Sequence, residues 1–271
     1  MSNFSAVKII DSAGAAQGVL MENGTLTSRD YLIGVAEGEI ANHTQFQKLG
    51  YSPLAPSGVS DVNCNNASYV FPTAAQQMQA ISSSGNDAAA GTGVKTIRIY
   101  YLKDDYTEAT TDVVLTGTTP ALTGVSDIFR VQFIRVLDFG AGVTTHTAIG
   151  KIDVRNKTTT TLIYGTISAG NTAGRDSAYT VPEGHTLYLT SFACGVAKAT
   201  TGNSCIFTLR ANYDDKLPGA LTAGLFFMPY AELNLVDSME TREFKIPLVF
   251  PEHTDIKVSA IAGQAASILT S

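Results

Sequence analysis

The chain has 271 residues and a formal net charge of −6 at pH 7, from 18 Lys and Arg against 24 Asp and Glu. Proteins that bind nucleic acid by neutralising phosphates carry clustered positive charge, so this balance argues against nucleic acid as a partner. Only 15% of the residues are charged, whereas 44% are hydrophobic, which is enough apolar material for a packed core. No run of about 18 apolar residues occurs, so we expect no transmembrane helix and no membrane partner.

Residues 1–75 are predicted to form an extended arm or docking region. This segment is rich in Gly, Asn and Pro and has weak periodicity, with short strands expected at 6–10 and 19–21 and one helical turn near 42–49. Such an arm becomes ordered by lying on the rest of the chain or on a neighbouring subunit. The first eleven residues have no apolar run typical of a signal peptide, so we expect the chain to fold in a cytoplasm.

Residues 76–170 are predicted to form a first β domain. At its start, residues 73–82 begin with Thr at an N-cap position followed by good helix formers, which predicts a short helix. Residues 82–93 are a loop by composition, and beyond them the hydrophobic period changes to two. The stretch 127–137 is expected to be a strand, although a buried helix also fits it. The expected inward rows are Ile97, Ile99 and Tyr101, followed by Phe129, Val131, Phe133 and Leu137.

Residues 171–271 are predicted to form a C-terminal β-sandwich of jelly-roll type. A Pro-x-Gly turn at 182–184 precedes a strand on which Leu187 and Leu189 alternate with polar residues. Pro247 cannot donate a ladder hydrogen bond, so its strand is placed at a sheet edge or a bulge. The whole chain is therefore predicted to be all-β, with antiparallel sandwich domains and an extended arm. The other inward rows are Cys205, Phe207 and Leu209, then Phe244, Ile246, Leu248 and Phe250, then Ile256, Val258 and Ala260.

Cysteine and histidine spacing predicts neither a metal site nor a cofactor. Cys64, Cys194 and Cys205 form no CxxC pair and are odd in number, which fits neither a zinc site nor a disulfide framework. Cys194 and Cys205 alternate with apolar residues, so both are predicted to be buried thiols. The four histidines form no HxH or HExxH pattern; they are His43, His146, His185 and His253.

Two acidic pairs are the candidate ligand loops. They are Asp104 and Asp105 with Tyr106, and Tyr213 with Asp214 and Asp215. Carboxylate oxygens that converge on one site can bind calcium, and a pair at the right separation can hydrolyse a glycosidic bond. Each pair, however, follows a predicted strand and adjoins a lysine, where Asp is favoured as a turn former. Solvated turns are therefore the main prediction.

Motifs for phosphate binding and nucleophilic catalysis are incomplete. Residues 140–151 end in Gly-Lys, but the spacing differs from that of a P-loop and Ile152 stands where Ser or Thr is required. Residues 165–170 have one residue too many for a Gly-x-Ser-x-Gly elbow. No enzymatic activity is predicted from these segments.

Five tracts carry a family resemblance, two of them the shorter IRIYYL at 97–102 and VVLTGTT at 113–119. The other three are longer. They read SSSGNDAAAGTG at 82–93, TVPEGHTLYLTSF at 180–192 and PLVFPEHTDIKV at 247–258. These tracts resemble, in this order, the SSSxNDxAAGTG loop, the TVPxGxTxYLTxF segment and the PLxFPExTDIKV strand of β-rich virion structural proteins of tailed bacteriophages. The likeness spans residues 70–262.

The resemblance implies a non-enzymatic virion structural protein that is assembled in the host cytoplasm. On the capsid it would be a decoration protein or head-fibre component, and on the tail an adaptor, knob or fibre-base subunit. It would self-associate, as a trimer, and contact other virion proteins such as the major capsid protein. A carbohydrate-binding module is the alternative from another class. A host-surface glycan would then bind at the acidic pairs and at Tyr100, Tyr101, Tyr106, Tyr188 and Tyr213.

Overall fold

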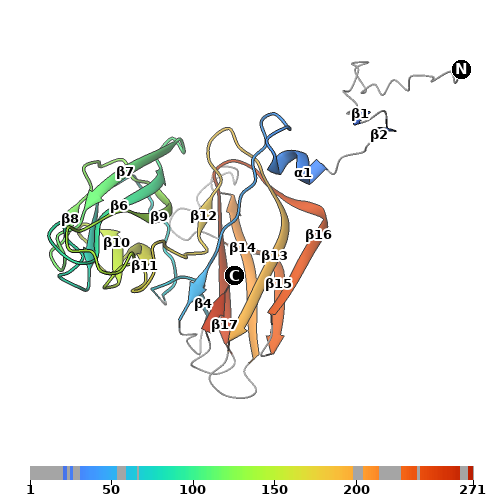
Figure 1. Ribbon diagram of the computed structural model, residues 1–271. Helices are drawn as coiled ribbons and strands as arrows, with labels where there is room; N and C mark the ends of the chain where they lie inside the picture. The colour runs from blue at the N-terminus through green and yellow to red at the C-terminus, as the bar shows by residue number, and fades with distance from the viewer. Residues whose placement is uncertain are drawn as a thin grey trace, which may run out of the picture. The chain divides into compact units, whose positions relative to one another are not determined.

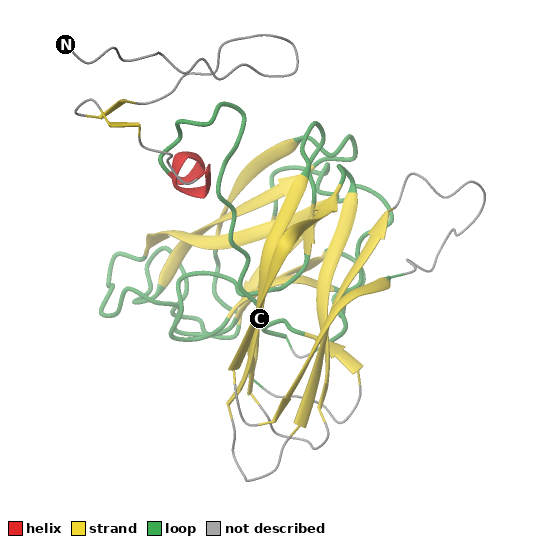
Figure 2. Cartoon of the chain, turned by 90° about the vertical axis from the view of Figure 1, so that its right-hand side faces the viewer, coloured by secondary structure: helices red, strands yellow, loops and turns green. Residues whose placement is uncertain are grey.

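The computed structural model describes residues 21–22, 25–26, 31–53, 59–65, 67–197, 204–213, 227–236, 239–262 and 268–270. The chain divides into a unit of residues 1–47 and a unit of residues 48–271. Figure 2 shows that strands make up nearly all of the regular structure, so the predicted all-β antiparallel fold is confirmed. Within the described residues, no helix has the length and apolar character needed to cross a membrane.

The first unit contains a strand pair, β1 (Met21–Glu22) and β2 (Thr25–Leu26), and the helix α1 (Tyr31–Ala36). The helical turn expected near 42–49 is wrong, because residues 43–49 have no regular structure and the helix lies earlier in the chain. The strand expected at 6–10 and residues 19 and 20 of the next one lie outside the described residues.

Seven strands form two antiparallel sheets around the first hydrophobic core (green strands in Figure 1). One sheet has the order β11-β10-β5-β8 and the other β7-β6-β9. Ile97, Ile99 and Tyr101 are all buried in this core, as the period-two pattern predicts. The strand bounds are β5 (Met78–Ser82), β6 (Val94–Leu102), β7 (Glu108–Val114), β8 (Ala121–Leu122), β9 (Arg130–Phe139), β10 (Ile152–Asn156) and β11 (Ile163–Ile167).

The short helix predicted at 73–82 is wrong, because residues Met78–Ser82 form strand β5. β5 lies between β10 and β8 in its sheet, and Met78 and Ala80 are fully buried. Helix propensity is a weak preference that burial and strand pairing override.

The inward row predicted for β9 is right at Val131 and wrong at Phe133 and Leu137, which are exposed. Tyr100 pairs with Phe133 whereas Tyr101 pairs with Val131, so Gln132 is an extra residue in the ladder. A bulge of this kind changes which side chains face the core, and simple alternation cannot detect it. The helical alternative for this stretch is excluded by the strand itself.

The serine- and glycine-rich loop 82–93 is organised around Asp87, which is fully buried. Its carboxylate accepts backbone N–H bonds from Val94 (2.9 Å), Ile149 (3.0 Å) and Gly150 (2.8 Å), and a hydroxyl bond from Ser82. A Cβ atom on Gly93 would lie 2.2 Å from Asp87 Oδ1, so only glycine fits beside the carboxylate. The low-complexity tract is therefore a fixed turn and not a linker.

The second hydrophobic core lies between two further antiparallel sheets (yellow to red strands in Figure 1). One sheet has the order β12-β17-β14-β15, with β4 also paired to β17, and the other has the order β16-β13-β18-β3. The strand bounds are β3 (Tyr51–Ser52), β4 (Val59–Asp61), β12 (Tyr179–Thr180), β13 (Leu187–Ala197), β14 (Ser204–Tyr213), β15 (Met228–Val236), β16 (Met239–Phe250), β17 (Thr254–Ala262) and β18 (Ile268–Thr270).

The inward rows of β14 and β17 are buried as predicted, and Pro247 does lie on an edge strand. The row predicted for β16 is wrong at Ile246, which is 84% exposed. Leu189 pairs with Leu248 and Ser191 with Glu243, so four residues of β16 face the single Thr190. This bulge turns Ile246 away from the core.

The two cores are joined by polar contacts that are themselves buried. Arg130 of β9 makes a bidentate ion pair with Asp255 of β17, with both N···O distances at 2.9 Å. The segment before β5 also connects the two cores. At one end, Asp61 accepts hydrogen bonds from Lys257 (2.9 Å) and Ser259 (2.8 Å) of β17 in the second core. At the other end, Phe71 packs in the first core. The arm is expected to lie on the rest of the chain or on another subunit, and at residues 59–65 and 67–72 it lies on the rest of the chain.

We expect Asp87→Ala to lower the free energy of unfolding by about 3 kcal/mol, because it leaves three buried N–H groups without an acceptor. Chemical denaturation measures the change. The matched control is Asp104→Ala, at an exposed turn position, which we expect to stay within about 0.5 kcal/mol of the wild-type chain. Equal effects of the two substitutions would contradict the structural role of Asp87.

Candidate functional site

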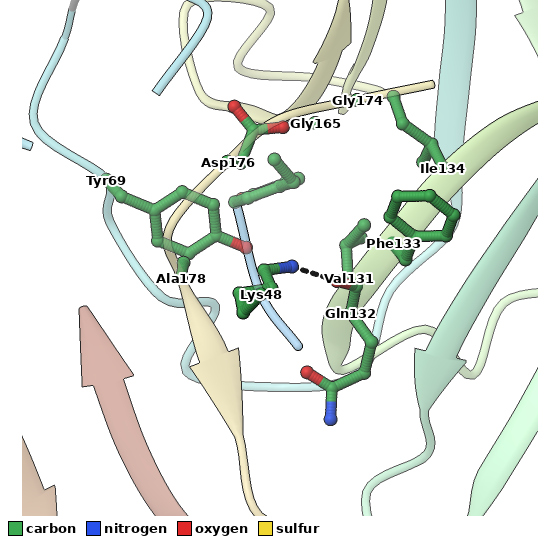
Figure 3. Close-up of a pocket in the computed structure, with 11 residues that line it drawn as sticks. Lys48, Tyr69, Val131, Gln132, Phe133, Ile134, Gly165, Gly174, Asp176 and Ala178 are labelled. Carbon is green, nitrogen blue, oxygen red and sulfur yellow. Dashed lines mark hydrogen bonds between the residues drawn. The ribbon is translucent and has the colours of Figure 1, made fainter. Parts of the chain in front are cut away.

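A small pocket in the second unit is the first candidate site (Figure 3). Lys48, Tyr69 and Asp176 are among its polar residues, with Gln132 and Tyr164, and Val131 and Ile134 are among its apolar walls. The cavity between them has a volume of about 10 Å³. One water molecule needs roughly 10–15 Å³ of such space, so the pocket suits only a water-sized or ion-sized ligand.

Lys48 and Asp176 are both partly buried in this pocket, and burial shifts the pKa of each toward its neutral form. The pKa of Lys48 falls to about 8 because of burial, although the nearby Asp176 charge opposes the fall. Burial raises the pKa of Asp176, opposed by backbone N–H bonds from Thr166 (3.0 Å) and Cys64 (3.1 Å). The Lys48 amine donates to the backbone carbonyl of Gln132.

Tyr69 completes the polar lining. Its hydroxyl is buried and has no hydrogen-bond partner among the described residues. Burial also raises the pKa of Tyr69 well above its usual range, so the phenol stays protonated. Chemically, the pocket offers a lysine that can be neutral near physiological pH, a carboxylate and a phenol. Such a set can bind one small polar ligand, and a lysine of lowered pKa is also a nucleophile.

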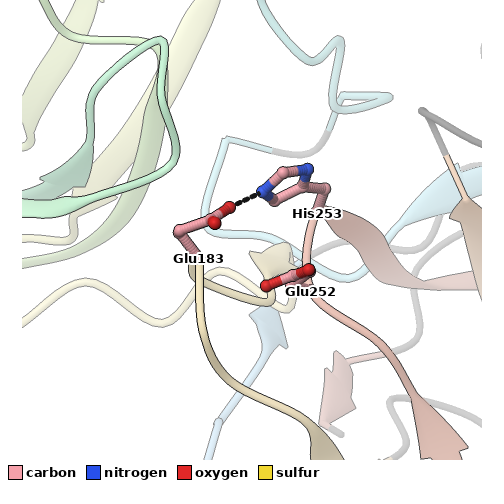
Figure 4. A group of neighbouring side chains, drawn as sticks. All are labelled: Glu183, Glu252 and His253. Atoms are coloured by element: carbon pink, nitrogen blue, oxygen red, sulfur yellow. Dashed lines mark hydrogen bonds and ion pairs between the residues drawn. The ribbon is translucent and has the colours of Figure 1, made fainter.

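A second candidate is the cluster of Glu183, Glu252 and His253 (Figure 4), whose donor atoms all lie within 4.8 Å of one another. The carboxylate of Glu183 bonds to His253 Nε2. Gly184 N donates to Glu252 at 2.7 Å, and His253 N donates to the carbonyl of Val181 at 2.8 Å. The turns at 181–185 and 251–254 are therefore fastened to each other.

The β6–β7 turn of the first core also reaches this cluster. The ring of Tyr106 stacks on that of His253, with centroids 4.0 Å apart and an interplanar angle of 15°. Both residues have left-handed backbone, with φ of 60° at Tyr106 and 65° at His253. Non-glycine residues adopt this conformation only where the surroundings hold them in it. Together these contacts place the cluster where the two cores meet.

The same three residues are the part of the described chain best suited to a metal ion. One imidazole nitrogen and two carboxylate oxygens form a donor set that zinc and related transition ions accept. All three groups already have protein partners, because Gly184 N donates to Glu252 and Glu183 bonds to His253. An ion would have to displace these hydrogen bonds.

The structure places only some of the residues predicted as ligand loops. Asp104 and Asp105 lie on the exposed β6–β7 turn, where Asp105 accepts hydrogen bonds from Thr107 N (3.0 Å) and Thr107 Oγ1 (2.6 Å). Tyr106 is turned onto His253. Tyr213 ends β14 with its backbone paired to Thr254, beside the same cluster. Asp214 and Asp215 lie outside the described residues. Whether the acidic pairs bind a ligand stays a prediction.

The three cysteines are free and buried, as predicted for Cys194 and Cys205. Burial raises the pKa of all three thiols, that of Cys205 to about 11. None is therefore poised as a nucleophile, since the thiolate is the reactive form.

The sequence did not predict that Lys48, Tyr69 and Asp176 line one pocket. They are far apart in the chain, and no local pattern connects them, so only the fold could bring them together. A signal did exist for the second cluster: Pro182-Glu183 and Pro251-Glu252 repeat the same dipeptide at two turns. This repetition marks both of the turns that meet there.

Comparisons with known proteins add no relative. No family model matches the chain, and neither the curated proteins nor the solved structures include one similar to it. The site must therefore be interpreted from its own geometry.

We expect the stability difference between the wild-type chain and Lys48→Met to depend on pH. Below pH 8 the folded chain bears the cost of a charged, partly buried Lys48, and this cost is relieved as pH rises toward 10.5. Between pH 7 and 10 the wild type should gain on the order of 2 kcal/mol relative to the variant. Denaturation at several pH values measures this gain, with exposed Lys157→Met as the control. A flat or falling difference would contradict the burial of Lys48.

We expect His253→Gly to be more stable than His253→Ala by about 1 kcal/mol. Both variants lose the stack on Tyr106 and the bond to Glu183, but glycine alone relieves the left-handed backbone. Thermal unfolding of the two variants tests this order. If alanine is the more stable, the backbone at this position is not left-handed in solution.

Proposed function

We propose that the chain is a non-enzymatic structural protein of a tailed-bacteriophage particle. Its place would be on the capsid, as a decoration protein or head-fibre component, and it would work as a homo-oligomer. The proposal rests first on the three longer tracts that resemble virion structural proteins. It rests second on what those tracts do in this fold.

Each tract has a structural task. The tract at 82–93 folds around Asp87. The tracts at 180–192 and 247–258 pack on each other, since Thr180 pairs with Asp255 and His253 N donates to Val181. The polar residues of these tracts therefore hold segments of the chain together. A protein that must keep its shape within a particle requires such contacts.

The observation that carries the proposal is the buried joint between the two cores. Relative motion is the usual expectation for two domains unless an extensive, water-excluding interface joins them. Here the fully buried Arg130–Asp255 pair links β9 of the first core to β17 of the second, and both cores belong to one unit. Two cores with a buried ionic link between them, in a chain with few charged residues, favour a building block over a hinged enzyme.

Quantitative mass spectrometry of purified particles of the phage that encodes the chain tests this proposal. On the capsid, we expect the chain in a fixed ratio to the major coat protein. About a dozen copies or fewer per particle would instead place it on the tail, as an adaptor or fibre-base subunit. Its absence from purified particles would contradict the proposal.

A further inference from the structure

One side of the second sandwich is formed by strands β15 and β16, which we call the β15–β16 edge. Each strand lies at the end of its sheet, and within the described part of the chain each pairs with one neighbour, β15 with β14 and β16 with β13. Tyr230 of β15 packs edge-to-face on Phe250 of β16, with ring centroids 5.1 Å apart. The two edge strands therefore belong to the same side of the sandwich.

This edge carries a concentration of exposed apolar side chains. β16 is twelve residues long, and most of it is exposed on both faces instead of alternating between core and solvent. Ile246 is 84% and Met239 78% exposed, and Val249, Met228 and Val236 are also exposed on the same two strands. Unpaired strand edges are normally protected, and grouped apolar residues on them indicate a surface that binds another protein.

The charges of β16 indicate which protein. Glu240, Arg242, Glu243 and Lys245 supply two charges of each sign within six residues, although the whole chain has a net charge of −6. In a contact between copies, the same patch is present on both sides, so it must contain both signs to be self-complementary. β16 carries equal numbers of positive and negative charges and so meets this condition. A partner with a strong charge of one sign would not be complementary to this strand.

The size of the edge also fits such a contact. Twelve residues at about 3.3 Å each give a length of roughly 40 Å. Two sheets about 10 Å apart, with their outer side chains, give a width of roughly 20 Å. The product, roughly 800 Å², is about what each partner buries in a specific interface of standard size.

We infer that the β15–β16 edge binds the same edge of a second copy of this chain, a two-fold contact that pairs two copies in place of the trimer that the resemblance implies. This inference rests on the proposed function, because it names the surface through which the structural protein self-associates. Pro247 and the bulge opposite Thr190 interrupt the ladder in the second half of β16, so side chains such as Ile246 make the contact there in place of continued strand pairing.

Light scattering of the full-length chain over a concentration series tests the inference. The wild-type chain is expected to form an oligomer. Met239→Lys/Ile246→Lys is expected to raise its dissociation constant about 100-fold or more, because the two most exposed apolar side chains of the edge are replaced by charges. Val114→Lys/Leu122→Lys is the matched control, since these exposed apolar residues lie on the first core's sheets. Circular dichroism checks that both variants are folded.

Reversing the charges of β16 distinguishes a specific contact from nonspecific hydrophobic association. Glu240→Lys/Glu243→Lys and Arg242→Glu/Lys245→Glu should each associate poorly alone and should recover association when mixed. A monomeric wild-type chain overturns the inference, and so does an oligomer that the edge variants leave intact. In either case the chain's presence in purified particles would still support the proposed function, so the two proposals fail separately.

Discussion

The buried ion pair of Arg130 and Asp255 is the interaction on which the rest of the structure depends. Removing two charges from water costs several kcal/mol for each ion, and only good geometry with further hydrogen bonds offsets this cost. The structure supplies both, because the pair is bidentate, Arg130 also donates to the Pro72 carbonyl, and Thr180 donates to Asp255. These partners come from four different segments, so satisfying one pair fixes the positions of β9, β12, β17 and the segment before β5.

The candidate cluster at the surface is a continuation of this joint. Thr180 and Asp255 lie within three residues of Glu183 and His253, and the guanidinium of Arg130 also faces the ring of Tyr106 at 6.0 Å. The two turns that carry the cluster are thus placed by the buried pair beneath them. This arrangement explains how two non-glycine residues keep left-handed backbone there, since the contacts on every side hold the turns in position.

Local pattern predicted much of this fold and little of its sites. The rows Ile97 to Tyr101 and Ile256 to Ala260 were predictable because period-two alternation records which face is buried. Phe133 and Ile246 were not, because bulges shift the pairing without any change in composition. Strand β5 was missed because burial overrode helix propensity. Lys48 and Asp176 are 128 positions apart, and nothing short of the folded chain shows that they share a pocket.

The distance along the chain between Arg130 and Asp255 has a consequence for synthesis. The two residues are separated by 125 positions, so the ribosome completes the whole first core before it makes the carboxylate that neutralises Arg130. Until then the Arg130 guanidinium stays hydrated, and the interface between the two cores is not formed. The interface between the two cores therefore forms only after β17 has been synthesised. A prematurely terminated chain would leave this interface exposed to cellular proteases.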